Sequence, residues 1–154
     1  MDLCISAREV ALPDLASRLL YRDRYICVAR KRHPLKARRI SVKQLCAFDH
    51  LLVDPTGESF SGVADLILDT LHSRRRVAMA VPTFHLLFEL LAGDDFIAFV
   101  PETIAHKRES ELRVFETGLA LPAIDVLATW HPRLSGDAQH KWLRALLLKV
   151  AKAR

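Results

Sequence analysis

Residues 77–101 read VAMAVPTFHLLFELLAGDDFIAFVP, and this stretch decides the fold class. Val77–Val81 is a short apolar run typical of a buried strand, and Pro82-Thr83 marks the start of a helix. Gly93-Asp94 then turns the chain into a second apolar run, Phe96–Val100. Because the connections are short, the stretch predicts one strand–helix–strand unit with its two strands parallel.

The alternation continues on both sides of this unit. Ser41 can cap a short helix, Leu51–Val53 is a further apolar run, and Asp54–Gly57 breaks the chain before the next helix. Pro101 begins another helix after the second strand. Strand and helix therefore alternate from residue 41 to 110, which predicts an α/β domain with a largely parallel sheet.

Two helices show apolar faces that predict how they pack. In the helix after Gly57, the predicted core stripe consists of Val63, Leu66, Ile67, Thr70 and Leu71. Asp65 and Asp69 are expected to face outward. In the closing helix, residues 137–152, the predicted face consists of Trp142, Leu143, Leu146, Leu147 and Val150. Further strands are expected at residues 2–6, 25–29, 112–115 and 124–130.

The composition is typical of a soluble globular chain. It has 154 residues, 51% of them hydrophobic, which is enough to bury a core. No apolar run approaches the roughly 20 residues of a membrane span, so no membrane partner is expected. The chain starts without a secretory signal, which favours the cytoplasm, and its three scattered cysteines predict neither a disulfide framework nor a zinc site.

The net charge of +5 is unevenly distributed. Residues 1–40 hold 10 basic and 4 acidic side chains, residues 41–130 hold 7 and 13, and residues 131–154 hold 6 and 1. Helix-turn-helix and zinc-finger spacings are absent from the sequence, so the charge alone does not indicate DNA reading. The run Arg74-Arg75-Arg76 is interpreted as a solvated helix end rather than a phosphate clamp.

Motifs for catalysis are missing from the sequence. There is no GxSxG elbow, GxGxxG loop, Walker loop or HExxH pair, and the seven histidines stand singly. We therefore predict no catalytic residue, no metal site and no cofactor, and the chain is not expected to be an enzyme. A small α/β enzyme is kept only as an alternative, since it would need a convergent nucleophile, base and oxyanion site.

Two strand-to-helix turns carry the chemistry of a binding site. They are Thr56-Gly57-Glu58-Ser59 and Pro82-Thr83-Phe84. In open α/β sheets ligands gather at the carboxyl ends of strands, where helix N-termini favour anions such as carboxylates. The alternative is that these residues are only helix caps. Glu58 also counts against an anion, because it would repel one.

The end of the chain resembles a known family. Trp130-His131-Pro132-Arg133, Asp137 and residues 140–144 (HKWLR) are similar to the ending of LysR-type transcriptional regulators, in the branch of the nodulation and aromatic-degradation regulators. His33-Pro34-Leu35 and the stretches around Val81–Phe84 and Asp95–Pro101 also resemble that family. The likeness covers the whole chain.

The resemblance implies a type 2 periplasmic-binding-protein-like α/β fold of two subdomains with largely parallel sheets. Residues 33–116 would form subdomain II, and residues 1–32 with 117–154 would form an incomplete subdomain I. Both basic ends would then belong to one subdomain and the acidic middle to the other. The family's winged helix-turn-helix does not precede Met1, so the chain is expected to be a fragment without a DNA-binding domain, with uncovered sheet edges and apolar helix faces that favour self-association.

The resemblance also implies a partner and a site. The partner would be a small effector, with aromatic acids as the leading class, bound in the cleft between the subdomains, where it would shift the balance between their arrangements. Its site carries over to Thr56, Gly57, Glu58, Thr83, Phe84 and Thr129. The two threonines of the turns would donate hydrogen bonds, Phe84 would pack on a ring and Thr129 would line the wall.

Other roles follow from the same likeness. His131, Arg133 and Trp142 are expected to hold the last helix on the sheet rather than touch the effector. A homo-oligomer is expected, and DNA would be bound only through the missing N-terminal domain, so this chain alone is not expected to read DNA. The alternatives are a free-standing small-molecule-binding module and a truncated regulator without function.

Overall fold

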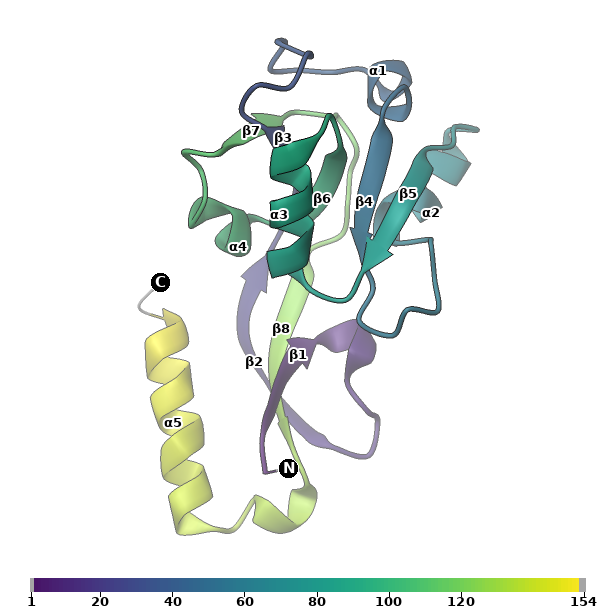
Figure 1. The fold of residues 1–154 in the computed structure, drawn as a ribbon. Coiled ribbons are helices and arrows are strands. Elements are labelled where there is room, and N and C mark those ends of the chain that lie inside the picture. The colour runs from purple at the N-terminus through teal and green to yellow at the C-terminus, as the bar shows by residue number, and fades with distance from the viewer. Residues whose placement is uncertain (1, 153–154) are drawn as a thin grey trace. The chain divides into compact units, whose positions relative to one another are not determined.

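The computed structural model of the chain describes residues 2–152, and its contacts divide the chain into two compact units (Figure 1). Unit 1 consists of Met1–Asp23 and Ala123–Arg154, and unit 2 is Arg24–Pro122. The boundaries predicted from the sequence, near residues 32 and 117, lie inside unit 2. The difference arises because strand β3 (Tyr25–Arg30) hydrogen-bonds to two strands of unit 2.

Unit 2 is built on a five-stranded mixed sheet in the order β5-β4-β6-β3-β7. The other strands are β4 (Asp49–Val53), β5 (Arg76–Val81), β6 (Ile97–Pro101) and β7 (Leu112–Phe115). β4 runs parallel to β5 and β6, as the alternating pattern predicted, whereas β3 runs antiparallel to β6 and β7. The expectation of a largely parallel sheet therefore holds for β5, β4 and β6 only.

Helices cover both faces of this sheet. On one face, α1 (Val42–Cys46) and α2 (Val63–Thr70) bury Leu45 and Leu68. On the other face, α3 (Phe84–Gly93) and α4 (Glu102–His106) bury side chains such as Phe88. Removing these apolar groups from water is the main contribution to the stability of the unit. Because the helices cover the two faces of the sheet, the turns lie at the ends of its strands.

The orientation of α2 differs from the prediction. Ala64 and Leu68 form its buried face, while Leu66, assigned to the core stripe, is 66% exposed. Leu71 is also exposed, and Asp65 is partly buried instead of facing outward. The helix is rotated about its axis relative to the prediction, because Asp65 points inward to form an ion pair with the buried side chain of Arg75.

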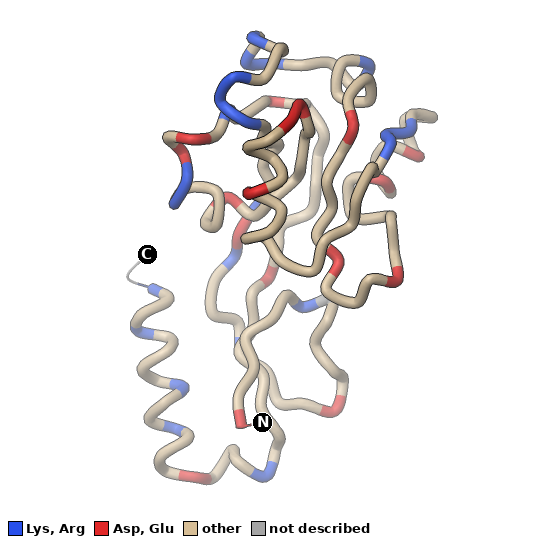
Figure 2. The backbone as a smooth tube through the Cα atoms, in the orientation of Figure 1, with Lys and Arg blue, Asp and Glu red and all other residues tan. Residues whose placement is uncertain are grey.

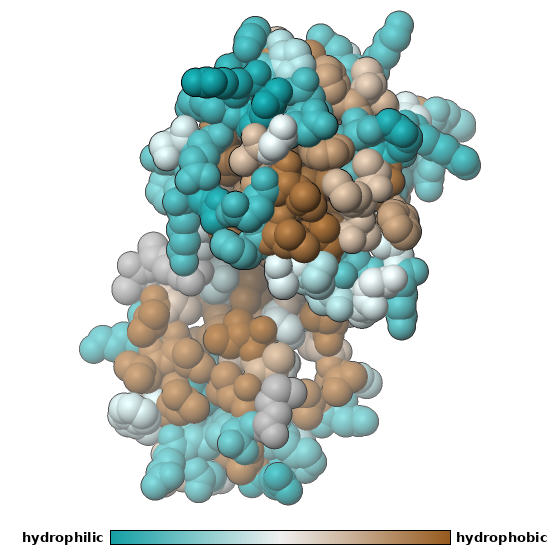
Figure 3. Space-filling model, viewed as in Figure 1, coloured by the Kyte–Doolittle hydropathy of each residue, from teal (hydrophilic) through white to brown (hydrophobic). Residues whose placement is uncertain are grey.

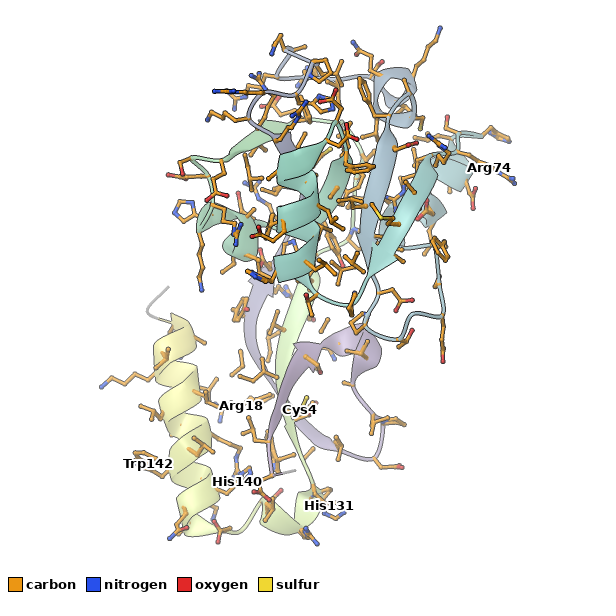
Figure 4. The ribbon with its side chains drawn as sticks, viewed as in Figure 1. Cys4, Arg18, Arg74, His131, His140 and Trp142 are labelled. Carbon is orange, nitrogen blue, oxygen red and sulfur yellow. The ribbon has the colours of Figure 1, made fainter. Side chains whose placement is uncertain are left out.

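The run Arg74-Arg75-Arg76 is not a solvated helix end. It leads into β5: Arg74 is exposed (Figure 4), Arg75 is buried against Asp65, and Arg76 pairs with Asp49 of β4. The charges divide differently between the two units than between the predicted subdomains. Unit 2 contains 14 basic and 12 acidic side chains, because the basic segment after residue 23 belongs to it.

Unit 1 is a three-stranded antiparallel sheet in the order β1-β8-β2, with a long helix, α5 (Ala138–Lys152). Its strands are β1 (Cys4–Ala7), β2 (Ala16–Asp23) and β8 (Ile124–Trp130), and short 3-10 turns lie at Arg8–Val10 (η1) and Pro132–Leu134 (η2). The sequence patterns predict β1 and β8 but not β2. Its register shifts between Leu19 and Tyr21, which breaks the alternation that identifies a strand.

The predicted apolar face of α5 is only partly buried. Trp142 is 67% exposed, and Leu146 and Val150 are exposed too, so Trp142 does not fix the helix to the sheet as expected. His140 is the buried residue of this helix. No helix within residues 2–152 combines the length and apolar character needed to cross a bilayer.

Candidate functional site

The two turns predicted to bind a ligand lie next to each other in unit 2. β4 and β5 are parallel neighbours with Val53 opposite Val81, so both turns follow the carboxyl ends of adjacent strands. The backbone N–H of Asp54 donates to the carbonyl oxygen of Val81 at 2.9 Å and ties the turns together. This is the edge at which open α/β sheets bind ligands.

Asp54 organises the first turn. Its carboxylate accepts hydrogen bonds from the Thr56 N–H at 2.9 Å, the Thr56 hydroxyl at 2.7 Å and the Ser59 N–H at 2.7 Å. The hydroxyl of Thr56, followed by these N–H groups, lowers the pKa of Asp54 to about 2. In the sequence Asp54 stands in a predicted chain break, and its role was not predicted, although an Asp two residues before a Thr is a signal for such a turn.

The predicted residues of this turn differ in what they offer a ligand. Gly57 has a φ of 70°, a left-handed conformation that glycine adopts at little cost. Thr56 is exposed, but its hydroxyl already donates to Asp54 and accepts from the Glu58 N–H at 3.3 Å. Thr56 therefore cannot donate to a ligand without losing a bond to Asp54. Glu58 is exposed and places a carboxylate on the turn.

The second turn leaves a donor available. Thr83 is the N-cap of α3, and its hydroxyl oxygen accepts from the Leu86 N–H at 3.3 Å. This bond uses a lone pair, so the hydroxyl hydrogen remains free to donate. Phe84 follows as the first residue of α3, half-buried against the core of unit 2. A hydroxyl donor, an aromatic ring and the positive end of a helix thus meet at one point.

Thr129, the remaining predicted residue, belongs to unit 1. It is in the middle of β8, 2% exposed, and its hydroxyl donates to the carbonyl oxygen of Cys4 at 3.5 Å. Figure 4 shows Cys4 on the neighbouring strand β1. The structure therefore brings together the predicted residues of the two turns in unit 2, but it gives Thr129 a buried position within its own sheet.

A buried ion pair holds the helix that follows the first turn. The guanidinium of Arg75 donates to both carboxylate oxygens of Asp65, at 2.8 and 2.7 Å, and Asp65 also accepts from the Gly62 N–H at 2.7 Å. Burial opposes ionisation of Asp65, but these hydrogen bonds outweigh it and lower its pKa. The start of α2 is thereby tied to the beginning of β5.

The motif at the end of the chain forms a cluster within unit 1. The His140 ring bonds to the carbonyl oxygen of Asp2 at 2.8 Å and to Arg144. Arg144 lies over the ring of Trp130 at 4.5 Å, and Trp130 donates to the Ser135 hydroxyl at 3.0 Å. His131 and Arg133, which were expected to hold α5, are exposed. His140, Arg144 and Trp130 therefore do this instead.

Titratable groups in residues 2–152 do not gather into a metal centre: no cluster of three or more His, Cys, Asp or Glu side chains is found there. The three cysteines are free, and burial raises the pKa of the Cys27 thiol, although the charge of Arg75 opposes this shift.

Residues 1–152 match the LysR substrate binding domain family. The chain belongs to this family. It is 31% identical over 145 residues to NagR, an HTH-type transcriptional activator of Ralstonia sp, an alignment covering 90% of this chain and 48% of NagR. It is 28% identical over 152 residues to NahR, an HTH-type transcriptional activator of Pseudomonas putida, covering 97% and 50%. The chain thus spans about half the length of these relatives, which are regulators rather than enzymes.

Solved structures show the same fold as this LysR substrate-binding domain. The regulatory domain of MexT, a transcriptional activator of Pseudomonas aeruginosa, aligns with a TM-score of 0.77 at 24% identity, over 97% of this chain and 72% of that domain. The effector-binding domain of QuiR, solved with shikimate, aligns with a TM-score of 0.75 at 17% identity, over 99% and 73%. The predicted fold class and family are confirmed.

Proposed function

We propose that this LysR substrate-binding domain senses a small carboxylic acid, with an aromatic ring in the preferred ligand, through the turns that follow β4 and β5. The observation that carries the proposal is the pairing of Thr83 and Phe84 at the N-terminus of α3. A free hydroxyl and the first N–H groups of a helix suit a carboxylate, and an adjacent ring suits an aromatic or cyclic body. QuiR, a structural neighbour, was solved with shikimate, a small cyclic carboxylic acid without an aromatic ring.

Two acidic side chains set the position of the ligand. Asp54 is ionised at neutral pH, and Glu58 is exposed on the same turn. Both would repel an anion, so the carboxylate should lie against the N-terminus of α3 and away from the first turn. In this arrangement Thr56 and Gly57 shape the wall of the site without donating to the acid.

A thermal-shift titration tests the proposal. The purified chain is melted with benzoate, with shikimate and with cyclohexanecarboxylate, which has the charge of benzoate but no aromatic ring. A ligand that binds only the folded state raises the melting temperature, by an amount that saturates with its concentration. We expect benzoate to raise it more than cyclohexanecarboxylate.

Variants of Thr83 provide the matched control. Thr83→Ser keeps both the helix cap and the hydroxyl donor, whereas Thr83→Ala loses both and costs about 1 kcal/mol of stability in the absence of ligand. The shift should persist in Thr83→Ser and disappear in Thr83→Ala. Equal shifts in both variants would remove this turn from the site, and no shift with any acid would reject the ligand class.

The proposal extends to assembly. In unit 1, Trp142, Leu146 and Val150 expose one apolar stripe of α5, and Figure 3 shows apolar surface in this part of the chain. Exposed apolar surface of this kind favours association, so we propose a homo-oligomer. Sedimentation velocity should show concentration-dependent association that weakens in Trp142→Gln. The control Lys141→Gln changes an exposed polar residue next to Trp142 in the helix and should leave the association unchanged.

We also propose that this domain regulates transcription as part of a longer protein. The relatives are named as HTH-type activators, and this chain spans about half of their length. Sequence-specific DNA reading would then belong to residues outside the matched domain. Translating the DNA upstream of the Met1 codon in all frames tests this: a helix-turn-helix supports it, and its absence favours a free-standing small-molecule-binding module.

A further inference from the structure

The connection between β3 and α1 carries a dense cluster of positive charge. Of the ten residues 30–39, six are Lys or Arg and none is acidic. Figure 2 shows blue stretches along this connection, at the top of unit 2. The cations with exposed side chains are Lys31, Arg32, Lys36, Arg38 and Arg39. We call these five residues, together with Arg113 of β7, the basic surface.

The backbone under the basic surface is firmly held. His33 is fully buried, its ring bonds to the carbonyl oxygen of Asp95 at 3.3 Å, and it packs on Phe48 with ring centroids 4.6 Å apart. At the far end, the Glu116 N–H donates to the Arg38 carbonyl oxygen at 2.8 Å. The cations therefore stand on an ordered loop joined to strand β7, rather than on a loose segment.

Acidic partners do not neutralise this surface. Arg38 and Arg39 share one carboxylate, that of Glu116, at 2.8 and 3.7 Å. Arg113 donates to the carbonyl oxygens of Lys31 and Lys36, at 3.2 Å each, and so keeps its full charge. Among the described residues, no acidic side chain pairs with Lys31, Arg32 or Lys36. One carboxylate, that of Glu109, lines the same groove, where it faces the four cations Lys31, Lys36, Arg38 and Arg113.

The shape of the surface suits an extended anion. Lys31, Lys36, Arg38 and Arg113 line an open groove of about 610 Å³ along the edge strand β7. A single small anion would need convergent donors in an enclosed site, whereas a phosphate backbone offers charges at regular intervals along a line. The surface also lies at the sheet edge opposite the two ligand turns, because β3 runs antiparallel to β6, and β6 runs parallel to β4.

We propose that the basic surface binds the phosphate backbone of double-stranded DNA without reading its sequence. The chain is similar to NagR and NahR, which are HTH-type transcriptional activators, so DNA is the polyanion in the surroundings of these relatives. Contacts to phosphate add affinity and fix orientation but carry no base information. The inference is independent of the effector site, since it uses other residues at another edge of unit 2.

Fluorescence anisotropy of a labelled random duplex of about 20 base pairs tests this inference, at salt concentrations from about 50 to 200 mM. The natural chain should bind with an affinity in the roughly 10⁻⁴–10⁻⁶ M range of non-specific DNA binding, falling steeply with salt. The variant Lys31→Gln/Arg32→Gln/Lys36→Gln should bind at least about tenfold more weakly and reduce the slope of log affinity against log salt by about 3.

A matched variant separates a local surface from net charge. Lys141→Gln/Lys149→Gln/Lys152→Gln removes the same three charges from exposed positions of α5 and should change the affinity by less than about threefold. Equal losses in the two triple variants would overturn the proposal, as would no binding by the natural chain at low salt. Binding to poly-glutamate but not to the duplex would assign the surface to an acidic protein instead.

Discussion

The guanidinium of Arg75 is paired with the carboxylate of Asp65 inside unit 2, through two hydrogen bonds of 2.8 and 2.7 Å, and the Arg75 side chain is only 1% exposed. The same carboxylate accepts from the Gly62 N–H at the start of α2. A side chain added at Gly62 would place its Cβ 2.9 Å from Leu52, so the chain is closely packed here. The pair therefore fixes both the rotation of α2 and the end of the loop that begins at Asp54.

Removing the carboxylate should be strongly destabilising. Asp65→Ala leaves the Arg75 charge buried without a partner, and the loss of one member of a buried pair costs about 3–5 kcal/mol. Urea unfolding followed by circular dichroism measures this cost. The neighbouring pair of Arg76 with Asp49 is the control, since Arg76 is exposed. Asp49→Ala should cost no more than about 1 kcal/mol, and equal losses in the two variants would disprove the asymmetry.

The orientation of α2 gives a second prediction. Leu68→Ala should destabilise unit 2 by about 2–5 kcal/mol because Leu68 is 1% exposed in the core. Leu66→Ala should stay within about 0.5 kcal/mol, because that side chain is solvent-exposed. Melting temperatures of the two variants decide between the observed face and the stripe predicted from apolar spacing. If Leu66→Ala proved the more damaging, the observed rotation of the helix would be incorrect.

Buried histidines predict a loss of stability on mild acidification. Burial, reinforced by the charge of Arg75, lowers the pKa of His50 to about 4, although its bond to the Leu45 carbonyl oxygen opposes the shift. The unfolded chain, with a histidine pKa of about 6.5, then binds more protons between pH 6.5 and 4. Stability is therefore complete above pH 6.5 and falls towards pH 4, by up to about 1.4 kcal/mol per pH unit for this group.

His50→Gln isolates the contribution of this ring. Glutamine can still donate to the Leu45 carbonyl oxygen but does not titrate. Between pH 7 and 4.5 the variant should lose less stability than the natural chain. Some pH dependence should remain, since burial also lowers the pKa of His33. Identical pH profiles for the two proteins would show that His50 does not carry the effect.

The cap of α3 separates stability from binding. Thr83→Asn keeps an acceptor for the Leu86 N–H but replaces the hydroxyl donor, so its melting temperature without ligand should stay close to that of the natural chain. Its response to benzoate should nevertheless decrease, because the donor geometry has changed. A full benzoate response in this variant would mean that the Thr83 hydroxyl contributes only as a helix cap.

Local patterns predicted the elements whose apolar residues face one core. The strands and helices from residue 49 to 106 appear where the alternation placed them, because both faces of the central sheet are covered and its strands are continuous apolar runs. β2 escaped prediction because Arg18 and Arg22 interrupt it and its register shifts near Tyr21. Antiparallel pairing of β3 depends on contacts far along the chain, which a local pattern does not contain.

The prediction of which face of α2 is buried was wrong for a different reason. Apolar spacing assigns every aspartate to the surface, but the partner of Asp65 stands ten residues later, inside a run of three arginines. Only the folded chain shows that Arg75 points inward while Arg74 and Arg76 do not. For the candidate site, the turns at Thr56 and Thr83 follow from strand ends, whereas the role of Asp54 depends on side-chain hydrogen bonds within its turn.

The most direct test of the central claim is a two-dimensional amide NMR titration of the chain with benzoate. A ligand held by the turns after β4 and β5 should shift the amide signals of residues 56–59 and 84–86 in proportion to its occupancy. The same signals should move less with cyclohexanecarboxylate. Saturable shifts confined to other elements, or unchanged spectra of the folded chain at high benzoate, would contradict a carboxylate-sensing site at this edge of the sheet.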